Sequence, residues 1–130
     1  MDIVIDTSAL LSVIMAEPER DSIVNVTSGH SLIGPGSIPW EIGNAFTAML
    51  KQGCLSVADA QRGMKIFQKI PLRYVEVDFN SAISVASQAK IYAYDAYFLD
   101  CALRHTAPLL TLDRAMTRAA HRFSIKVIGV

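Results

Sequence analysis

Short runs of apolar, often β-branched residues recur along the chain and predict strands. The clearest run, residues 3–5, ends at Asp6 and has the unbroken apolar character of a strand covered on both faces. Further runs of this kind, of which the first is the weakest, lie at residues 31–33, 74–77, 108–112 and 126–128.

Between these runs, apolar residues recur at helical spacing. Thr7 or Ser8 can cap a first helix, Pro39 suits the first turn of a later one, and Gly53 ends that helix. Tyr92 to Tyr94 interrupt another stretch, after which Asp95 opens a new helix. The expected helices cover residues 9–16, 20–26, 39–52, 56–69, 80–90, 96–104 and 114–122.

Alternation of strands and helices implies right-handed crossovers and a mainly parallel sheet. The 130 residues are enough for one domain with a core and too few for two ordinary domains. The composition, 52% hydrophobic and 18% charged, fits a packed α/β protein. We therefore expect one domain over residues 1–130, a three-layer α/β/α sandwich with four to five strands in its sheet.

Four acidic residues occupy similar places in this pattern, because each lies where a strand or loop meets a predicted helix. They are Asp6, Glu41, Asp95 and Asp113. Such junctions lie along one edge of a parallel sheet, so acids far apart in sequence can converge there. Each acid alone also suits a helix start, where a carboxylate meets free amides and the helix dipole. Asp6 fits that role least, since Thr7 and Ser8 are available as caps.

Carboxylates that converge raise one another's pKa values and destabilise the fold unless a divalent cation neutralises them. Oxygen ligands without histidine or cysteine favour Mg²⁺ or Mn²⁺ over zinc. Such ions activate water and stabilise charge on a reacting phosphodiester. The acids therefore indicate a metal-dependent hydrolase that acts on phosphodiester bonds.

Four segments contain these acids: IVIDTSAL at residues 3–10, PWEIGN at 39–44, YDA at 94–96 and LTLDR at 110–114. In order and spacing they resemble the PIN-domain nucleases, particularly the VapC-type toxins of toxin–antitoxin pairs, over nearly the whole chain. The resemblance implies metal-dependent hydrolysis of RNA, commonly by a homodimer that a cognate antitoxin restrains. It assigns metal binding and catalysis to the four acids, and supporting roles to Thr7, Ser8, Asn44 and Thr111.

Other charged residues have two interpretations. Asp100 lies five residues after Asp95 on the same predicted helix and is turned away from it. An outer role at the site is one reading, and solvent exposure or a local salt bridge is the other. Basic residues also form two stripes at helical spacing. Each stripe can contact RNA or a partner protein, or can simply be a solvated face. The first comprises Arg114, Arg118 and Arg122, and the second comprises Arg62, Lys65 and Lys69.

Aromatic side chains flank the proposed acid site in the sequence. They are Trp40, Tyr92 and Tyr94. Such rings can stack on RNA bases, but packing of the loops at the sheet edge is the role that we expect.

The net charge is zero, with 12 basic and 12 acidic residues, and does not by itself indicate a nucleic-acid partner. The distribution is uneven: residues 1–50 hold six acids and one base, whereas residues 104–130 hold five bases and one acid. No apolar run approaches the roughly 20 residues of a membrane span. Cys54 and Cys101 lack metal or redox spacing, so we expect buried free thiols and a cytoplasmic protein.

Two other functions are compatible with parts of the pattern. Aspartate-nucleophile phosphotransferases also begin with an acid at a strand end, but they need a second acid two residues later, where this chain has Ser8. They also need a later lysine, and none lies near Asp95 or Asp113. A non-catalytic PIN-like module that binds RNA or protein is the other alternative, although all four acidic positions are occupied.

Overall fold

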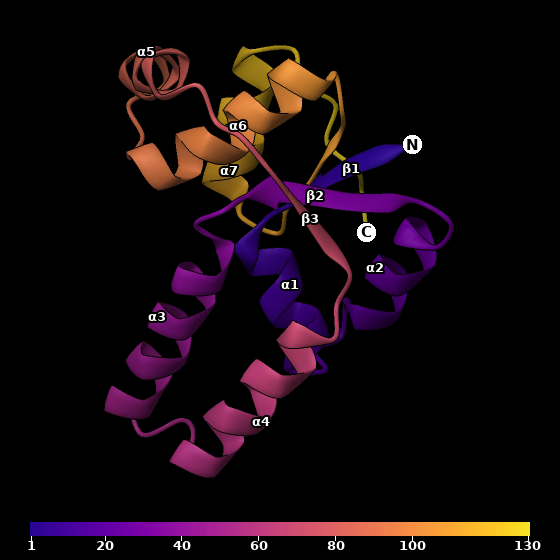
Figure 1. Cartoon of the computed structure of the whole chain (residues 1–130), viewed down its shortest axis with the longest axis vertical. Coiled ribbons are helices and arrows are strands. Elements are labelled where there is room, and N and C mark those ends of the chain that lie inside the picture. Colours follow the sequence, from indigo (N-terminus) through magenta and orange to yellow (C-terminus); the bar gives the residue numbers. More distant parts are fainter.

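The computed structural model describes residues 1–130, in which seven helices alternate with four strands (Figure 1). The strands are β1 (Asp2–Ile5), β2 (Ser31–Pro35), β3 (Leu72–Val75) and β4 (Leu109–Leu110). The helices are α1 (Thr7–Ile14), α2 (Arg20–Thr27), α3 (Ile38–Lys51), α4 (Val57–Gln68), α5 (Phe79–Ala89), α6 (Ala93–His105) and α7 (Arg114–Arg122).

All strand pairs in the sheet are parallel, and the strand order is β3-β2-β1-β4. The chain steps outward from β1 to β2 and β3, and then returns past β1 to form β4. The direction of crossing therefore reverses between β1 and β4. At such a point the loops after the two strands diverge and leave a crevice, which is where open α/β sheets bind ligands.

Helices cover both faces of the sheet, as the three-layer α/β/α prediction requires. In Figure 1, α5, α6 and α7 lie on one side of the strands and α1 to α4 on the other, with α3 and α4 extending beyond the sheet as a pair. Helix α6 contacts β1, β2 and β4. The sheet lies in the core, since Ile3, Val4 and Ile5 of β1 are each at most 1% exposed and both residues of β4 are fully buried.

Local sequence signals account for most helix starts. Ser56 caps α4 and forms a reciprocal capping box with Asp59, while Asp78 caps α5 by accepting a hydrogen bond from the amide of Ser81. Gly53 adopts a φ of 75° after α3, a left-handed conformation that glycine adopts without strain. Helix α6, however, begins at Ala93, so residues expected to interrupt the helical pattern form its first turn.

Three strand predictions need correction. The third strand lies at Leu72–Val75 rather than 74–77, and β4 is reduced to two residues. The expected strand at 126–128 is a single bridge between Leu109 and Val127. The second strand extends to Pro35, which pairs with Val75 of β3, so it is two residues longer than predicted.

The two cysteines differ in environment. Both thiols are free, and Cys101 is buried, which raises its pKa to about 12. Cys54 is exposed in the connection between α3 and α4, so the expectation of burial is wrong there. None of the helices combines the length and apolar character needed to cross a bilayer.

The contact between α3 and α4 gives a matched test of packing. A Cβ at Gly63 would lie 2.7 Å from Cζ of the buried Phe46, whereas a Cβ at Gly43 would meet nothing within 4 Å. Gly43→Ala should therefore gain helix propensity and raise the free energy of unfolding by about 0.5–1 kcal/mol. Gly63→Ala should lower it by about 1 kcal/mol, because overpacking outweighs that gain. Urea denaturation followed by circular dichroism measures both, and equal shifts would contradict the packing.

Candidate active site

Asp6 lies directly after β1 and is fixed by three donors. Its Oδ1 accepts hydrogen bonds from the amide of Ala9 (3.0 Å) and the hydroxyl of Ser8 (2.7 Å). Its Oδ2 accepts one from the hydroxyl of Thr111. Asp6 is itself the cap of α1, so the expectation that Thr7 or Ser8 caps this helix is wrong. The side chain is only 4% exposed.

Hydroxyl groups join the end of β1 to the segment that follows β4. The oxygen of Ser8 accepts a hydrogen bond from the amide of Leu112 (3.0 Å), and that of Thr111 accepts one from the amide of Asp113 (3.0 Å). Each hydroxyl therefore donates to Asp6 and accepts from a backbone amide of the segment after β4. These contacts tie together the two segments that carry Asp6 and Asp113.

Glu41 lies in the first turn of α3 and is held by two hydroxyl groups. Thr7 donates to Oε1 (3.1 Å) and Ser37 donates to Oε2 (2.7 Å). Ser37 was not predicted from the sequence. It precedes α3 at the capping position but directs its hydroxyl to Glu41 instead of to an amide. A serine four residues before the acid, at a helix start, was the available signal.

The remaining two acids are less constrained. Asp113 caps α7, where its Oδ1 accepts hydrogen bonds from the amides of Ala115 (2.8 Å) and Met116 (3.1 Å), and it is exposed. Asp95 is half-buried in the first turn of α6. Burial and the charge of Asp113 are the only effects on its pKa, and no hydrogen-bond donor offsets them.

Burial and mutual repulsion make these acids one electrostatic cluster. Burial is the largest cause that raises the pKa of three carboxyls, those of Asp6, Glu41 and Asp95. Like charges add to it: Asp113 raises the pKa of Asp6 and of Asp95. Asp95 and Asp6 in turn raise that of Glu41. The hydroxyl donors act in the opposite direction for Asp6 and Glu41, without cancelling the shift.

The cluster has the donor chemistry of a site for a hard divalent cation. Its ligand atoms are all carboxylate oxygens, and the hydrogen bonds to Asp113 fall on one oxygen, which leaves the other available. In their present conformations no three acids are placed to hold a metal ion. Ion binding therefore requires side-chain adjustment, which Asp95 and Asp113 can make more easily than the buried Asp6.

Asp100 belongs to a different contact. It is 2% exposed, its Oδ2 accepts a hydrogen bond from the amide of Asp78 (3.0 Å), and it lies 3.9 Å from Nε of Arg104. The expected solvent exposure is wrong and the expected local salt bridge is correct. Asp100 thus joins α6 to the start of α5, and it does not contribute to the pKa shifts of the acid cluster.

Several predicted site neighbours are exposed. Asn44 lies one turn along α3 from Glu41 and faces solvent. The three arginines of α7 are also exposed, and none of them pairs with a carboxylate; they are Arg114, Arg118 and Arg122. The aromatic residues are exposed as well, which contradicts their expected role in loop packing. Their exposed fractions are 74% for Trp40, 87% for Tyr92 and 57% for Tyr94.

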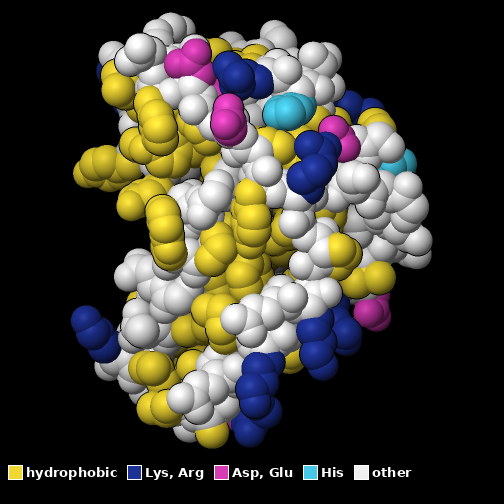
Figure 2. All heavy atoms as spheres, viewed as in Figure 1, with side chains coloured by type: hydrophobic (Ala, Val, Ile, Leu, Met, Phe, Trp, Pro, Cys, Tyr) yellow, Lys and Arg dark blue, Asp and Glu magenta, His cyan; other side chains and the backbone are white.

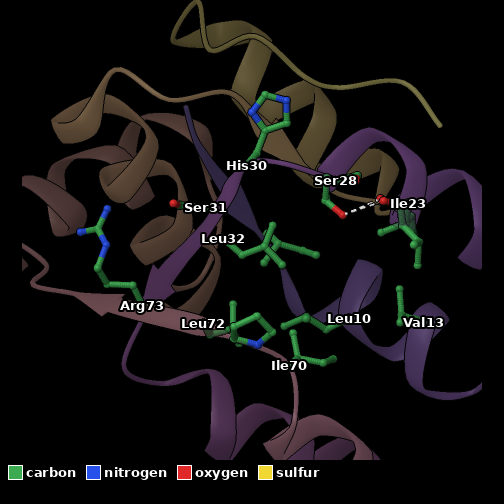
Figure 3. Close-up of a pocket in the computed structure, with 14 residues that line it drawn as sticks. Leu10, Val13, Ile23, Ser28, His30, Ser31, Leu32, Ile70, Leu72 and Arg73 are labelled. Atoms are coloured by element: carbon green, nitrogen blue, oxygen red, sulfur yellow. Dashed lines mark hydrogen bonds between the residues drawn. The ribbon is translucent and has the colours of Figure 1, made fainter.

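The main cavity of the protein lies elsewhere. It has a volume of about 660 Å³ and opens between α1, α2, β2 and β3 (Figure 3). Figure 3 shows Leu10, Leu32 and Leu72 around this space, whose lining is largely apolar. No member of the acid cluster lines it. The acid cluster therefore lies outside this apolar cavity.

Solved structures share this fold at low sequence identity. PAE2754 from Pyrobaculum aerophilum has a TM-score of 0.71 and 20% identity over 92% of this chain and 79% of its own. VapBC2 from Rickettsia felis, bound to a promoter DNA fragment, has a TM-score of 0.68 and 12% identity over 98% of both chains. A toxin–antitoxin complex from Klebsiella pneumoniae has a TM-score of 0.57 and 16% identity over 85% of this chain and 86% of its own.

No curated protein matches the chain significantly. The family model of the PIN domain, however, matches residues 3–122, a span that includes all four acids of the cluster. The parallel sheet between two helical layers agrees with that match. The chain therefore belongs to the PIN-domain family.

Proposed function

We propose that this protein is a metal-dependent endoribonuclease and the toxin of a toxin–antitoxin pair. The observation that carries the proposal is that Asp6, Glu41, Asp95 and Asp113 lie close enough for their charges to raise one another's pKa values, with Asp6 and Asp113 just beyond β1 and β4. Buried carboxylates that repel one another are destabilising in the absence of a cation. Membership of the PIN-domain family supports phosphodiester hydrolysis as the reaction.

The residues have distinct roles in this proposal. A bound Mg²⁺ or Mn²⁺ supplies positive charge beside the phosphodiester and a water of lowered pKa. Asp6 and Glu41 are oriented by four hydroxyl groups and keep their positions before any ion arrives; the donors are Thr7, Ser8, Ser37 and Thr111. Asp95 and the free oxygen of Asp113 complete the ligand set. Hydrolysis adds water across one P–O ester bond, and the leaving oxygen takes up a proton.

The structural relatives support the proposed partners. Two of the similar structures are described as a VapBC complex and a toxin–antitoxin complex, which favours a cognate antitoxin for this chain as well. The exposed basic residues of α4 can meet an acidic segment of such a partner; they are Arg62, Lys65 and Lys69. A homodimer remains part of the proposal on the resemblance to VapC-type toxins.

The contacts of Asp6 disfavour a phosphoryl transfer through an aspartyl intermediate. Both of its carboxylate oxygens accept hydrogen bonds, and Ser8 occupies the position of the second acid. A carboxylate that is buried and bonded in this way is a poor nucleophile toward phosphorus. A binding module without catalysis is distinguished from the nuclease by the first experiment below.

Replacement of Asp6 tests the catalytic role of the cluster. In Mg²⁺ or Mn²⁺, Asp6→Asn should lower the rate of RNA cleavage by about 100-fold or more, because a buried ligand charge is removed. Asp100→Asn is the matched control, since Asp100 is also a buried acid but contacts Asp78 and Arg104. It should cleave within a few-fold of wild type. Cleavage by wild type in excess chelator, or undiminished cleavage by Asp6→Asn, would contradict the proposal.

The raised pKa values of Asp6, Glu41 and Asp95 predict an unusual pH dependence of stability without metal. Such carboxyls stabilise the fold fully below their unfolded pKa of about 4, and this stabilisation is lost as pH rises through the folded-state pKa. In chelator, the thermal midpoint of wild type should therefore fall relative to that of Asp6→Asn as the pH rises above about 4. Saturating Mg²⁺ should reverse the difference. If the thermal midpoint depended on pH in the same way in wild type and in Asp6→Asn, the proposed electrostatic cluster would be contradicted.

The unpaired arginines of α7 predict contacts with the RNA backbone. Arg118→Ala should weaken RNA binding several-fold for all sequences, and it should lower the salt dependence of log K by about 0.7–1. Arg62→Ala is the control, because Arg62 is equally a surface base but is paired with Asp59 on α4. Fluorescence anisotropy at several salt concentrations measures both. An unchanged slope for Arg118→Ala would assign α7 to a solvated face.

A further inference from the structure

Helix α5 is exposed, yet it carries no charged side chain. None of its 11 residues is charged, although seven of them are exposed. Helix α1 is the only other helix without a charge, and none of its residues is exposed. The outer helices α2, α4 and α7 all carry exposed charges. The outer face of α5 therefore has the composition of a surface that another surface covers.

Large apolar side chains lie on this exposed face. Phe79 is 64% exposed and Ile83 is 63% exposed, and their spacing of four residues places them on one side of α5. Phe79 packs edge-on against Tyr97 of α6, with ring centroids 5.7 Å apart, and Tyr97 packs in the same way against Tyr94 at 5.8 Å. Figure 2 shows hydrophobic side chains on the left margin of the molecule, where Figure 1 places α5 and the start of α6. We call these four residues the α5 patch.

The rest of the chain does not cover the α5 patch. Helix α6 is the only element with which α5 shares an extensive contact, and the buried residues Ala82 and Val85 lie on the inner side of α5. The outer side stays open. Contiguous apolar surface of this kind on a soluble protein marks a site of association.

We propose that the outer face of α5 is the contact between two copies of this chain, with the two α5 helices packed antiparallel across a two-fold axis near Ser84. The contact rests on the proposed function, which includes a homodimer, and it gives the homodimer a location. The exposed residues of α5 that form it, beside Tyr94 of α6, are Phe79, Asn80, Ile83, Ser84, Ser87 and Gln88.

The charges around α5 favour a second copy over a different partner. In a two-fold contact, residues near the axis meet their own copies, so like charges there would repel. The charges that flank α5 are opposite in sign: Asp78 precedes the helix and the exposed Lys90 follows it. Arg104 lies near both Asp78 and the buried Asp100, so that end keeps one net negative charge. Antiparallel packing brings the acidic end of each helix to the basic end of the other.

The sizes of the side chains also fit a two-fold contact. Ser84 is the midpoint of α5, with the bulky Phe79 and Ile83 in the first half and the small Ser87 in the second. An axis at Ser84 therefore places the bulky half of each helix against the smaller half of the other. Small side chains at the crossing allow helix axes to approach to about 8–10 Å.

The required area extends the contact to α6. A helix of 11 residues is about 16 Å long, and its outer face alone falls short of the roughly 800 Å² per partner of a stable interface. The exposed Tyr94 continues the patch and supplies further area. Tyr94 immediately precedes Asp95, so the contact borders the acid cluster of each copy.

Sedimentation velocity of the purified chain over a wide range of concentrations tests the contact. Wild type should be a dimer, and Ile83→Asp should raise the dimer Kd by about 100-fold or more, because both copies then bury an unpaired carboxylate. Ile66→Asp is the matched control, since Ile66 is also an exposed isoleucine on a helix but lies on α4. It should leave the Kd within about three-fold of wild type. Circular dichroism confirms that both variants are folded.

A cross-link at the axis tests the geometry without disrupting the patch. Ser84→Cys in a Cys54→Ser background should form a disulfide-linked dimer under mild oxidation, because a residue on a two-fold axis lies beside its own copy. The background removes the exposed thiol and leaves only the buried Cys101. Ser22→Cys in the same background is the control, since Ser22 is an exposed serine on α2. It should remain uncross-linked on a non-reducing gel.

Several results would overturn the α5 contact. They are a wild type that stays monomeric at every concentration, a dimer that Ile83→Asp does not weaken more than Ile66→Asp, and equal cross-linking of the Ser84→Cys and Ser22→Cys variants. RNA cleavage by wild type in Mg²⁺, measured in parallel, separates this contact from the nuclease. A monomer that cleaves would refute the contact and leave the nuclease standing. A dimer with the expected variant behaviour but without cleavage would support the contact and refute the nuclease.

Discussion

The crowding of carboxylates at the carboxyl ends of β1 and β4 is the constraint that shapes the surroundings of the site. Burial and repulsion both disfavour the charged forms of Asp6, Glu41 and Asp95. The fold offsets this cost locally through hydroxyl groups on the segments after β1 and β4 and before α3. The donors are Ser8, Thr7, Thr111 and Ser37. The polar residues around the crevice follow from this requirement.

The same carboxylates also serve as helix caps, and the two roles do not compete. Asp113 uses one oxygen for two amides of α7 and leaves the other free. Asp6 uses one oxygen for the amide of Ala9 and the hydroxyl of Ser8, and turns the other toward Thr111. Each carboxylate oxygen has two lone pairs, so a cap can still coordinate an ion. In the sequence, capping and metal binding are alternative roles for each acid, whereas the structure combines capping with the clustering of the acids.

Local signals in the sequence were sufficient for the helices and for the parallel character of the sheet. The span of α7 agrees with the prediction, and caps such as Ser56 and Asp78 mark helix starts because capping depends on a few adjacent residues. The ends of β3 and β4 were misplaced, since strand ends depend on pairing with segments distant in sequence. Convergence of the acids followed from topology alone.

Side-chain environments were harder to predict than the elements. Asp100 is buried because the amide of Asp78 and the guanidinium of Arg104 meet it across α5 and α6, a contact that helical periodicity does not reveal. Helix α3 begins at Ile38, one residue before Pro39, from which its start was predicted. Ser37 therefore precedes the first turn and donates a hydrogen bond to Glu41. Trp40 and Tyr92 are exposed because no neighbouring helix or loop packs over them. Such tertiary packing cannot be predicted from the local sequence pattern.

The placement of charges separates RNA binding from RNA cleavage in the proposed function. The acid cluster repels phosphates until a cation is present, whereas the arginines of α7 carry no carboxylate partner. In the proposed function, affinity for RNA therefore comes from the arginines of α7, and reactivity comes from the acid cluster. A cation bound by the four carboxylates removes their repulsion of the RNA phosphates at the point where the RNA must approach most closely. The metal ion then determines where the scissile phosphate lies more than it determines the overall affinity for RNA.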